Sequence, residues 1–281
     1  MTTAEIGPLV DVAWLQRHLD DPRLRLADCR WYLAEPERGR TEYSMGHIPG
    51  AAYFSLDDEL SAAEGPGRHP LPDRKAFAVT LGQRGIDNDS LVVAYDDQGG
   101  AIAARLWWML GNVGHRNVAV LDGGLAAWQE GGGLLSADTV GRPPTSYRAK
   151  RRYGTVDRDR LYAFVGTTTL LDARAPERYR GEVEPIDPVA GHIPTAVNAP
   201  YDGNLDATGR FLDPATLASR YRGYGVTNTA DTVVYCGSGV TACHEILAME
   251  VAGMGRAWLY PGSWSDWSNS GYEIETKTGA E

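Results

Sequence analysis

The sequence predicts an α/β protein made of two similar tandem domains, each a mainly parallel sheet with helices on both faces. Three observations predict this fold. The chain has 281 residues, of which 43% are hydrophobic, so it is long enough for two ordinary domains with buried cores. It repeats itself once, and within each half short apolar runs alternate with helical patterns.

The repeat consists of three pairs of matching segments that follow the same order in both halves. The offset between the copies is roughly 140 residues, which is typical of duplicated domains and not of a solenoid. The pairs are MGHIPGAAYF at 45–54 with AGHIPTAVNA at 190–199, LVVAYDDQGGAIAARLWWML at 91–110 with TVVYCGSGVTACHEILAMEV at 232–251, and LDGGLAAW at 121–128 with YPGSWSDW at 260–267.

A polar segment between the two halves predicts a linker. It covers 136–154, and its Pro143 and Pro144 favour an extended, semi-stiff connection. We therefore expect an N-terminal domain at 1–136, a linker at 137–153 and a C-terminal domain at 154–281.

The alternation of strands and helices is clearest in the second half. The segment at 213–225 predicts a helix, because Leu217 and Tyr221 are four residues apart and a glycine, Gly223 or Gly225, can end it. Strands that alternate with helices form parallel sheets covered on both faces. Three apolar runs predict buried strands, at 169–174, 231–236 and 256–262.

Composition and charge exclude several classes of protein. A net charge of −10, without a run of Lys and Arg, offers no surface for nucleic acid. No apolar stretch approaches the roughly 20 residues of a membrane span, and the N-terminus lacks the basic and apolar blocks of a signal peptide. Three cysteines, Cys29, Cys236 and Cys243, do not suggest a disulfide framework. We expect a soluble cytoplasmic protein with reduced thiols that binds neither nucleic acid nor a membrane.

The thiol of Cys236 stands where a buried strand is expected to turn into a helix. Apolar residues with helical spacing begin at Val240, so the loop joins the end of a parallel strand to a helix N-terminus, where ligands bind in open α/β sheets. Gly237 and Gly239 permit backbone angles that turn N–H groups inward, and the helix start adds partial positive charge. The loop therefore predicts an anion cradle around the thiol, made of Gly237, Ser238, Gly239, Val240 and Thr241.

Cys236 is the candidate for chemistry, and the other two cysteines are expected to be structural. Cys243 faces into the predicted helix, and a buried structural role is the commoner one for a cysteine such as Cys29. In the repeat, Asp96 in AYDDQGG aligns with Cys236 when Tyr95 is placed on Tyr235. The first half therefore cannot carry out thiol chemistry at the equivalent position.

Two other kinds of cysteine site fit less well. A zinc site needs paired-cysteine spacing, which Cys236, Cys243 and His244 lack. A cysteine phosphatase needs an arginine that closes the loop around a phosphate dianion, whereas Thr241 and Ala242 follow here. The short cradle suits a persulfide or another small sulfur group. We expect neither a metal nor an organic cofactor.

These residues resemble the tandem-domain rhodanese-like sulfurtransferases over nearly the whole chain. The resemblance rests on both GHIP segments, at 46–49 and 191–194, on CGSGVTA at 236–242 and on GSWSDW at 262–267. The CGSGVT loop is similar to the 3-mercaptopyruvate sulfurtransferase branch, because the thiosulfate branch usually has charged residues after the cysteine. The resemblance implies two tandem rhodanese-like domains, of which only the C-terminal one is catalytic.

The resemblance also implies a Ser–His–Asp relay. Its serine maps onto Ser238, its histidine onto His69 in GRHPLP, and its aspartate onto Asp57 in AAYFSLDDEL. The N-terminal half would then lend two groups to the C-terminal thiol.

The carboxylate of the substrate needs a cation, and the resemblance implies arginines for it. The family arginine in ARAPERYRGE maps onto Arg178, with Arg174 and Arg180 nearby. A second family arginine is absent, and Pro185 aligns at its place. Either Arg180 substitutes for it or one arginine suffices.

The implied reaction is sulfur transfer through a persulfide on Cys236. The thiol would take the sulfur of 3-mercaptopyruvate and release pyruvate, and a thiophilic acceptor such as cyanide, a small thiol or thioredoxin would remove the outer sulfur. Two alternatives remain. One is thiosulfate:cyanide sulfur transfer by the same cysteine, and the other, from another class, is a rhodanese-like binding or redox-sensing module.

Overall fold

The computed structural model of the chain describes residues 6–139, 141–150 and 154–276. Positions 140 and 151–153 of the expected linker lie outside these residues. The chain forms two compact units that are not contiguous in the sequence. The first unit contains the described residues of 1–62, 72–153 and 207–211, and the second contains those of 63–71, 154–206 and 212–281. A short segment from each half of the chain, 63–71 or 207–211, therefore belongs to the unit that the other half builds.

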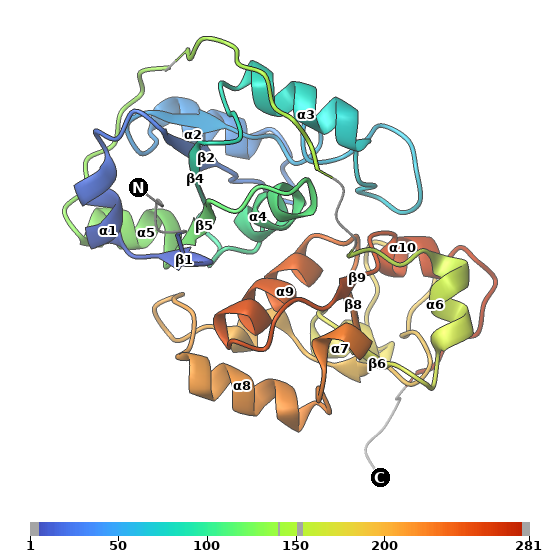
Figure 1. The fold of residues 1–281 in the computed structure, drawn as a ribbon. Helices are drawn as coiled ribbons and strands as arrows, with labels where there is room; N and C mark the ends of the chain where they lie inside the picture. The colour runs from blue at the N-terminus through green and yellow to red at the C-terminus, as the bar shows by residue number, and fades with distance from the viewer. Residues whose placement is uncertain (1–5, 140, 151–153, 277–281) are drawn as a thin grey trace. The chain divides into compact units, whose positions relative to one another are not determined.

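The first unit is built on a five-stranded sheet in which all neighbouring strands are parallel. Its strands are β1 (Leu9–Val10), β2 (Leu24–Asp28), β3 (Ala51–Tyr53), β4 (Leu91–Tyr95) and β5 (Val118–Leu121). Its helices are α1 (Val12–His18), α2 (Arg38–Met45), α3 (Arg74–Gln83), α4 (Ala103–Asn112) and α5 (Gly124–Glu130). The strand order is β1-β5-β4-β2-β3, with α1 and α5 on one side of the sheet and α3 and α4 on the other (Figure 1).

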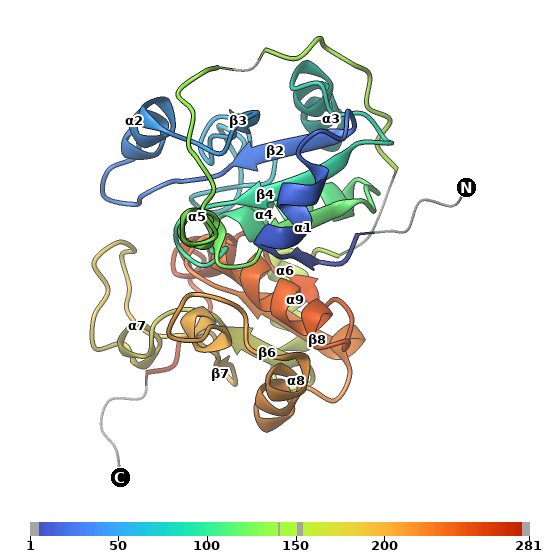
Figure 2. The ribbon, with the colours of Figure 1, turned by 90° about the vertical axis from the view of Figure 1, so that its left-hand side faces the viewer.

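The second unit is built on a four-stranded parallel sheet in the order β7-β6-β8-β9. Its strands are β6 (Thr169–Asp172), β7 (Val197–Asn198), β8 (Thr232–Tyr235) and β9 (Trp258–Leu259). Its helices are α6 (Arg158–Phe164), α7 (Pro176–Arg180), α8 (Pro214–Gly223), α9 (Thr241–Val251) and α10 (Ser263–Trp267), with short 3-10 helices at Tyr201–Asn204 and Thr229–Asp231. Figure 2 shows α8 beside α9, and Figure 1 shows α6 and α10 across the sheet from them.

The central strands of each sheet bury side chains on both faces under helices, because successive residues of a strand point to opposite faces. In the first unit, Leu26 and Val93 from the central strands pack in one cluster with Leu15 of α1. In the second unit, Leu170 and Val233 pack in a cluster with Leu161 of α6. The two sheets thus have separate cores, as two α/β domains require.

The predicted α/β fold with two parallel sheets is confirmed. The predicted helix at 213–225 is α8, and the helix expected from Val240 is α9, which begins one residue later. The strands expected at 169–174, 231–236 and 256–262 are β6, β8 and β9. All three strands are shorter than expected, because only these residues pair with a neighbouring strand.

The described part of the expected linker packs on the first unit. Thr145 N–H donates to Gly82 O, and Lys150 N–H donates to Val113 O, both at 2.8 Å. Backbone hydrogen bonds therefore hold the segment 141–150 in place.

A buried ion pair occurs at the same place in both units. In the second unit, Arg174 Nη2 donates to Asp172 Oδ2 at 2.6 Å and to Gly191 O at 2.7 Å. In the first unit, Arg30 Nη2 donates to Asp28 Oδ2 at 2.7 Å and to the glycine of the first GHIP segment. Both arginine side chains are almost fully buried. The pair ties the end of a central strand to GHIP in each unit, which explains why both sequence features recur.

A carboxyl group on α9 is fully buried. Asn204 Nδ2 donates to Glu245 Oε1 at 2.9 Å, and the hydroxyl of Tyr221 donates to Glu245 Oε2 at 2.6 Å. Burial raises the pKa of Glu245 from 4.5 to about 7, although the hydrogen bond from Tyr221 and the charge of Arg220 lower it. This carboxyl therefore titrates near neutral pH inside the folded unit.

Replacing this residue, Glu245→Gln, should remove a pH-dependent part of the free energy of unfolding. Between pH 4.5 and about 7 the folded wild type holds a proton that the unfolded chain releases. The free energy of unfolding of the wild type therefore falls as pH rises through this range, by roughly 3 kcal/mol for a shift of this size. Glutamine does not titrate, so urea unfolding should show the variant gaining stability relative to the wild type from pH 5 to pH 8. A difference between the two proteins that is the same at both pH values would contradict this account.

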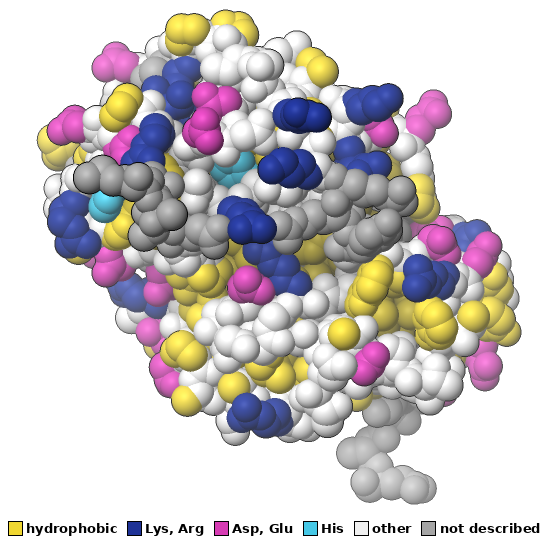
Figure 3. Space-filling view, viewed as in Figure 1, with side chains coloured by type: hydrophobic (Ala, Val, Ile, Leu, Met, Phe, Trp, Pro, Cys, Tyr) yellow, Lys and Arg dark blue, Asp and Glu magenta, His cyan; other side chains and the backbone are white. Residues whose placement is uncertain are grey.

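The surface of the second unit carries apolar side chains around α6. Tyr162 and Phe164 of this helix are exposed, and Figure 3 shows hydrophobic side chains gathered over it. The guanidinium of Arg160 lies over the rings of Phe164 and Trp258, so a cation covers part of this surface. Across the described part of the chain, no helix combines the length and the apolar character that crossing a membrane requires.

Candidate active site

Cys236 follows β8 directly, and the loop from Gly237 to Val240 leads into α9. The thiol is not part of a disulfide, and the residue is only 2% exposed. Gly239 N–H donates to Cys236 Sγ at 3.1 Å. The sulfur thus lies at the end of a parallel strand and close to a helix N-terminus, where backbone N–H groups and the helix dipole favour an anion.

The start of α10 fixes the thiol loop through its backbone. Trp264 N–H donates to Cys236 O, and Ser265 N–H donates to Gly237 O, both at 2.9 Å. Cys236 N–H donates to Ser263 Oγ at 3.1 Å. Ser263 has a φ of +52°, a region that favours glycine. The hydrogen bond to its hydroxyl gives a reason for serine at this strained position.

The two glycines of the loop differ in what their positions demand. Gly239 has a φ of +76°, and a Cβ on it would lie 2.5 Å from Pro261 O, so this position requires glycine. Gly237 has no such backbone angle, and a Cβ on it would lie 3.3 Å from Arg68 Nη2 and 3.4 Å from Arg178 Nη1. Two guanidinium groups therefore approach the residue that follows the thiol.

The first unit has a carboxylate at the position of the thiol. Tyr95 and Tyr235 are equivalent, because the hydroxyl of each accepts the N–H of the isoleucine in GHIP at 3.1 Å. The residues that follow them, Asp96 and Cys236, are therefore equivalent too. Burial raises the pKa of Asp96, while its backbone hydrogen bonds lower it. The side chain accepts four N–H groups at 2.8–2.9 Å, those of Gln98, Gly100, Ile102 and Ala103. This loop of the first unit is thus an anion cradle that its own carboxylate fills.

His69 and Ser238 form a hydrogen-bonded pair in the second unit. His69 Nδ1 lies 2.8 Å from Ser238 Oγ, and both residues are buried. His69 belongs to the segment 63–71, which is part of this unit. Gly67 lets the segment pack closely, since a Cβ on it would collide with Gly262 O. The structure thereby brings together two predicted site residues that are 169 positions apart in the sequence.

Asp57 belongs to the first unit, where Trp31 Nε1 donates to its Oδ2 at 2.7 Å. Its membership of a relay with His69 and Ser238 stays a prediction.

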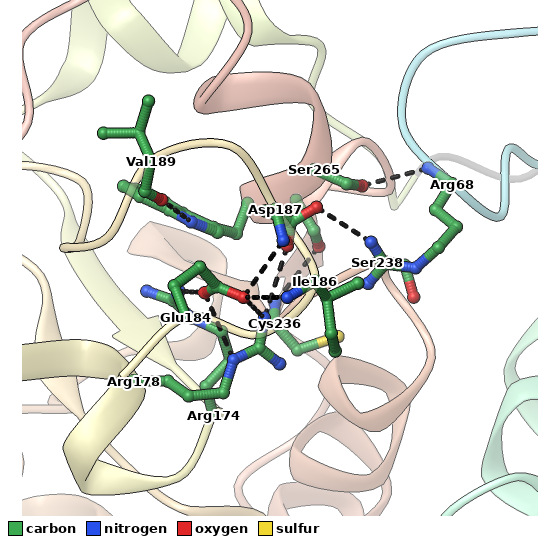
Figure 4. A network of polar contacts seen from close by, with 12 residues as sticks. Arg68, Arg174, Arg178, Glu184, Ile186, Asp187, Val189, Cys236, Ser238 and Ser265 are labelled. Atoms are coloured by element: carbon green, nitrogen blue, oxygen red, sulfur yellow. Dashed lines mark hydrogen bonds and ion pairs between the residues drawn. The ribbon is translucent and has the colours of Figure 1, made fainter. Parts of the chain in front are cut away.

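Arg178 of α7 points toward the thiol loop, and two carboxylates hold its guanidinium. Its Nε and Nη2 donate to Glu184 at 3.2 and 2.6 Å, and Nη2 also lies 3.3 Å from Asp187 Oδ2. Figure 4 shows this network beside Cys236. The guanidinium therefore has a fixed orientation, as a binding group for a planar carboxylate needs.

The other two predicted arginines have partners that favour structural roles. Arg174 lies in the buried pair with Asp172, and the first unit has the same pair without a thiol. Arg180 is 40% exposed and pairs with Glu182 at 2.6 Å. An exposed pair of this kind is a solvated surface contact. Arg178 differs from both, because its guanidinium lies beside Gly237 of the thiol loop.

Arg68 lies beside the thiol loop, and the sequence patterns do not point to it. Its Nη1 donates to Asp187 Oδ1 at 2.8 Å, and its backbone N–H donates to Ser265 Oγ at 2.9 Å. The only signal for it in the sequence is its place directly before the predicted histidine, His69. Its partner Asp187 is 119 positions away, and no local pattern joins the two.

The remaining cysteines are buried in the cores of their units. Cys29 and Cys243 are both 0% exposed. Burial raises the pKa of Cys29 well above its usual value. Cys243 Sγ donates to Gly239 O at 3.4 Å, so its thiol helps to shape the Cys236 loop. The described residues contain no group of three or more His, Cys, Asp or Glu side chains that could hold a metal ion.

Comparison with known proteins agrees with this geometry. The family model for the rhodanese-like domain matches residues 11–131 and 157–270. A probable 3-mercaptopyruvate sulfurtransferase of Pseudomonas aeruginosa is 45% identical over 92% of this chain and 94% of its own length. A putative thiosulfate sulfurtransferase of Mycobacterium tuberculosis is 41% identical over 96% of this chain and 93% of its own length.

Solved structures lead to the same family. The crystal structure of a 3-mercaptopyruvate sulfurtransferase from Escherichia coli has a TM-score of 0.81 and 33% identity, and it covers 92% of this chain and 100% of its own. The resemblance found in the sequence is confirmed by three findings. The family model matches the chain twice, the relatives align over most of the chain, and the structure contains two parallel sheets of the same fold. The chain belongs to the rhodanese family and carries two rhodanese-like domains in tandem.

Proposed function

We propose that the protein is a sulfurtransferase that moves a sulfur atom from 3-mercaptopyruvate through a persulfide on Cys236 to a thiophilic acceptor. The geometry around the Cys236 thiol supports this proposal most strongly. A buried thiol lies in a loop whose Gly239 N–H already donates to its sulfur, and the His69–Ser238 pair adjoins this loop. The names of the relatives support the reaction class, since they include 3-mercaptopyruvate and thiosulfate sulfurtransferases.

In the first step, Cys236 acts as a thiolate and attacks the sulfur of 3-mercaptopyruvate. A sulfur–sulfur bond forms, the carbon–sulfur bond breaks, and the electron pair of that bond passes into the ketone to give the enolate of pyruvate. The enolate takes up at carbon the proton that the thiol of the donor gives up, so pyruvate forms and the outer sulfur of the persulfide is left anionic. Ser238, polarised by His69 and Asp57, would relay that proton.

In the second step, an acceptor removes the outer sulfur of the persulfide. The acceptor forms a bond to that sulfur, the sulfur–sulfur bond breaks, and Cys236 leaves as a thiolate. Cyanide would become thiocyanate, and a small thiol or thioredoxin would become a persulfide. The cradle amides of Gly237, Ser238, Gly239, Val240 and Thr241 would stabilise the anionic outer sulfur between the steps. We place this chemistry in the cytoplasm, where the three free cysteines would stay reduced.

Thiosulfate is the second candidate donor, and two observations favour it. Relatives at 41% and 33% identity carry the name thiosulfate sulfurtransferase. Two guanidinium groups also approach the thiol loop, and their N–H groups can donate to the oxygens of thiosulfate as well as to a carboxylate.

Product analysis with both donors tests the proposal. With cyanide as acceptor, the purified protein should form pyruvate and thiocyanate in equal amounts from 3-mercaptopyruvate. With thiosulfate it should form sulfite and thiocyanate, and the kcat/KM for this reaction should be lower than that for 3-mercaptopyruvate. A higher kcat/KM with thiosulfate would reverse the assignment of the donor. Turnover of neither donor would leave the binding or redox-sensing module as the better account.

A further inference from the structure

We propose that Arg68 is the second cation of the donor site, and that Asp187 holds it in position beside Arg178. The inference rests on the proposed function and deepens it, because it names the groups that bind the anionic end of the donor.

The two guanidinium groups converge on one point above the thiol loop. Arg68 Nη2 and Arg178 Nη1 lie 3.3 and 3.4 Å from the position that a Cβ would take on Gly237. These two nitrogens can therefore contact the same small group over the residue next to the thiol. Any side chain at position 237 would occupy that space.

Carboxylates of the chain bind the other edges of the same guanidinium groups. Asp187 accepts from Arg68 Nη1 at 2.8 Å and from Arg178 Nη2 at 3.3 Å, so it bridges the two arginines (Figure 4). Glu184 accepts from Nε and Nη2 of Arg178. Both carboxylates are almost fully buried. They fix the orientation of the arginines and direct Arg68 Nη2 and Arg178 Nη1 toward Gly237.

One further donor of Arg68 is available. Its Nε is buried and has no hydrogen-bond partner among the described residues. A buried N–H without a partner is costly, so a ligand that accepts from it would lower that cost. Arg68 thus carries both the converging Nη2 and an unsatisfied Nε, a pattern that suits a carboxylate with two acceptor oxygens.

The backbone positions Arg68 without help from its side chain. Its N–H donates to Ser265 Oγ at 2.9 Å, and the preceding Gly67 packs against Gly262. Ser265 N–H in turn donates to Gly237 O. Segment 63–71 and the thiol loop are therefore fixed to the same start of α10, and a change of the Arg68 side chain leaves that anchor intact.

The chemistry of the pair favours a planar carboxylate. Arg68 and Arg178 carry two positive charges, and Glu184 and Asp187 carry two negative ones, so the four groups together are neutral. Attraction to a ligand then depends on directed N–H groups more than on net charge. An α-keto carboxylate such as 3-mercaptopyruvate or its product pyruvate matches these donors.

Arg68→Gln tests the inference, with Arg23→Gln as the control. Loss of a charged hydrogen bond is worth about 1.5–3 kcal/mol, so KM for 3-mercaptopyruvate should rise roughly 10- to 150-fold in Arg68→Gln while kcat stays within about threefold. Arg23→Gln removes the same charge from a solvent-exposed pair with Asp21 in the first unit and should leave both constants unchanged. An unchanged KM in Arg68→Gln would overturn the inference.

A binding measurement separates this inference from the proposed function. Calorimetry should detect pyruvate binding to the Cys236→Ser variant, and adding Arg68→Gln should weaken that binding by a similar factor. This result would support the anion site even if the wild type turned over neither donor. Turnover by the wild type, together with equal pyruvate affinity with and without Arg68→Gln, would overturn the inference and leave the proposed function standing.

Asp187→Asn tests the positioning role, and Glu182→Gln is its control because it removes a carboxylate from an exposed pair near the same loop. If Asp187 holds the two arginines side by side and in orientation, its loss should raise KM for 3-mercaptopyruvate about tenfold with little change in kcat. Glu182→Gln should change neither constant. A lower KM in Asp187→Asn would mean that Asp187 competes with the donor, and it would overturn the positioning role.

Discussion

Cys236→Ser should abolish sulfur transfer from 3-mercaptopyruvate and from thiosulfate, by roughly 10⁴-fold or more. Serine has nearly the shape of cysteine, but its hydroxyl is neither a comparable nucleophile nor an acceptor of sulfane sulfur at neutral pH. Formation of thiocyanate from cyanide measures the loss. Thermal unfolding of the variant should match that of the wild type, because the change removes no packing contact of the loop.

Cys243→Ser is the matched control for this replacement. Cys243 is seven positions further along the chain, and its side chain donates to Gly239 O, a hydrogen bond that a serine hydroxyl can also make. This variant should keep most of the wild-type rate. Activity that survives in Cys236→Ser, or that disappears in Cys243→Ser while the protein stays folded, would contradict the assignment of Cys236.

The second large effect is expected for the His69–Ser238 pair. His69→Ala and Ser238→Ala should each lower kcat on 3-mercaptopyruvate by roughly 10²- to 10⁴-fold, as is typical when acid–base help is lost. Thiosulfate leaves sulfite, which is already a stable anion and needs no proton on carbon, so its turnover should fall far less. The double variant should be little slower than either single variant, because members of one relay act as a unit.

His69→Asn separates proton transfer from local structure. An asparagine amide can stand near the position of Nδ1 and keep a hydrogen bond to Ser238, but it cannot take up or release a proton in this pH range. The variant should therefore be nearly as slow as His69→Ala on 3-mercaptopyruvate. If His69→Asn recovers most of the wild-type rate, the histidine only shapes the loop, and the relay is wrong.

The features of the fold and of the site that the sequence predicts are those that depend on local patterns along the chain. The apolar runs and helical spacing predict the parallel sheets, and two glycines after Cys236 predict the turn between β8 and α9. The repeat aligns Asp96 with Cys236, and backbone N–H groups donate to both side chains, four of them to Asp96 and that of Gly239 to Cys236. The repeat of Asp-x-Arg before GHIP could also have marked Arg174 as structural.

The parts that could not be predicted depend on contacts between distant positions. Nothing in GRHPLP indicates that segment 63–71 belongs to the second unit, because its anchors are the Gly67 packing and the Ser265 hydroxyl far along the chain. The partnership of Arg68 with Asp187 depends on the same placement. The division of the chain at the linker 137–153 and the catalytic role of Asp57 stay predictions.

If Cys236 carries the sulfur atom between donor and acceptor, a measurement of the intact mass detects that sulfur on the protein. The protein is incubated with 3-mercaptopyruvate without an acceptor, and its mass is compared with that of Cys236→Ser treated in the same way. We expect the wild type to gain the mass of one sulfur atom, which proteolysis assigns to the peptide containing Cys236 and which cyanide removes. Cys236→Ser should gain nothing. An unmodified wild type that still turns over the donor, or added sulfur found only on Cys29 or Cys243, would contradict the account.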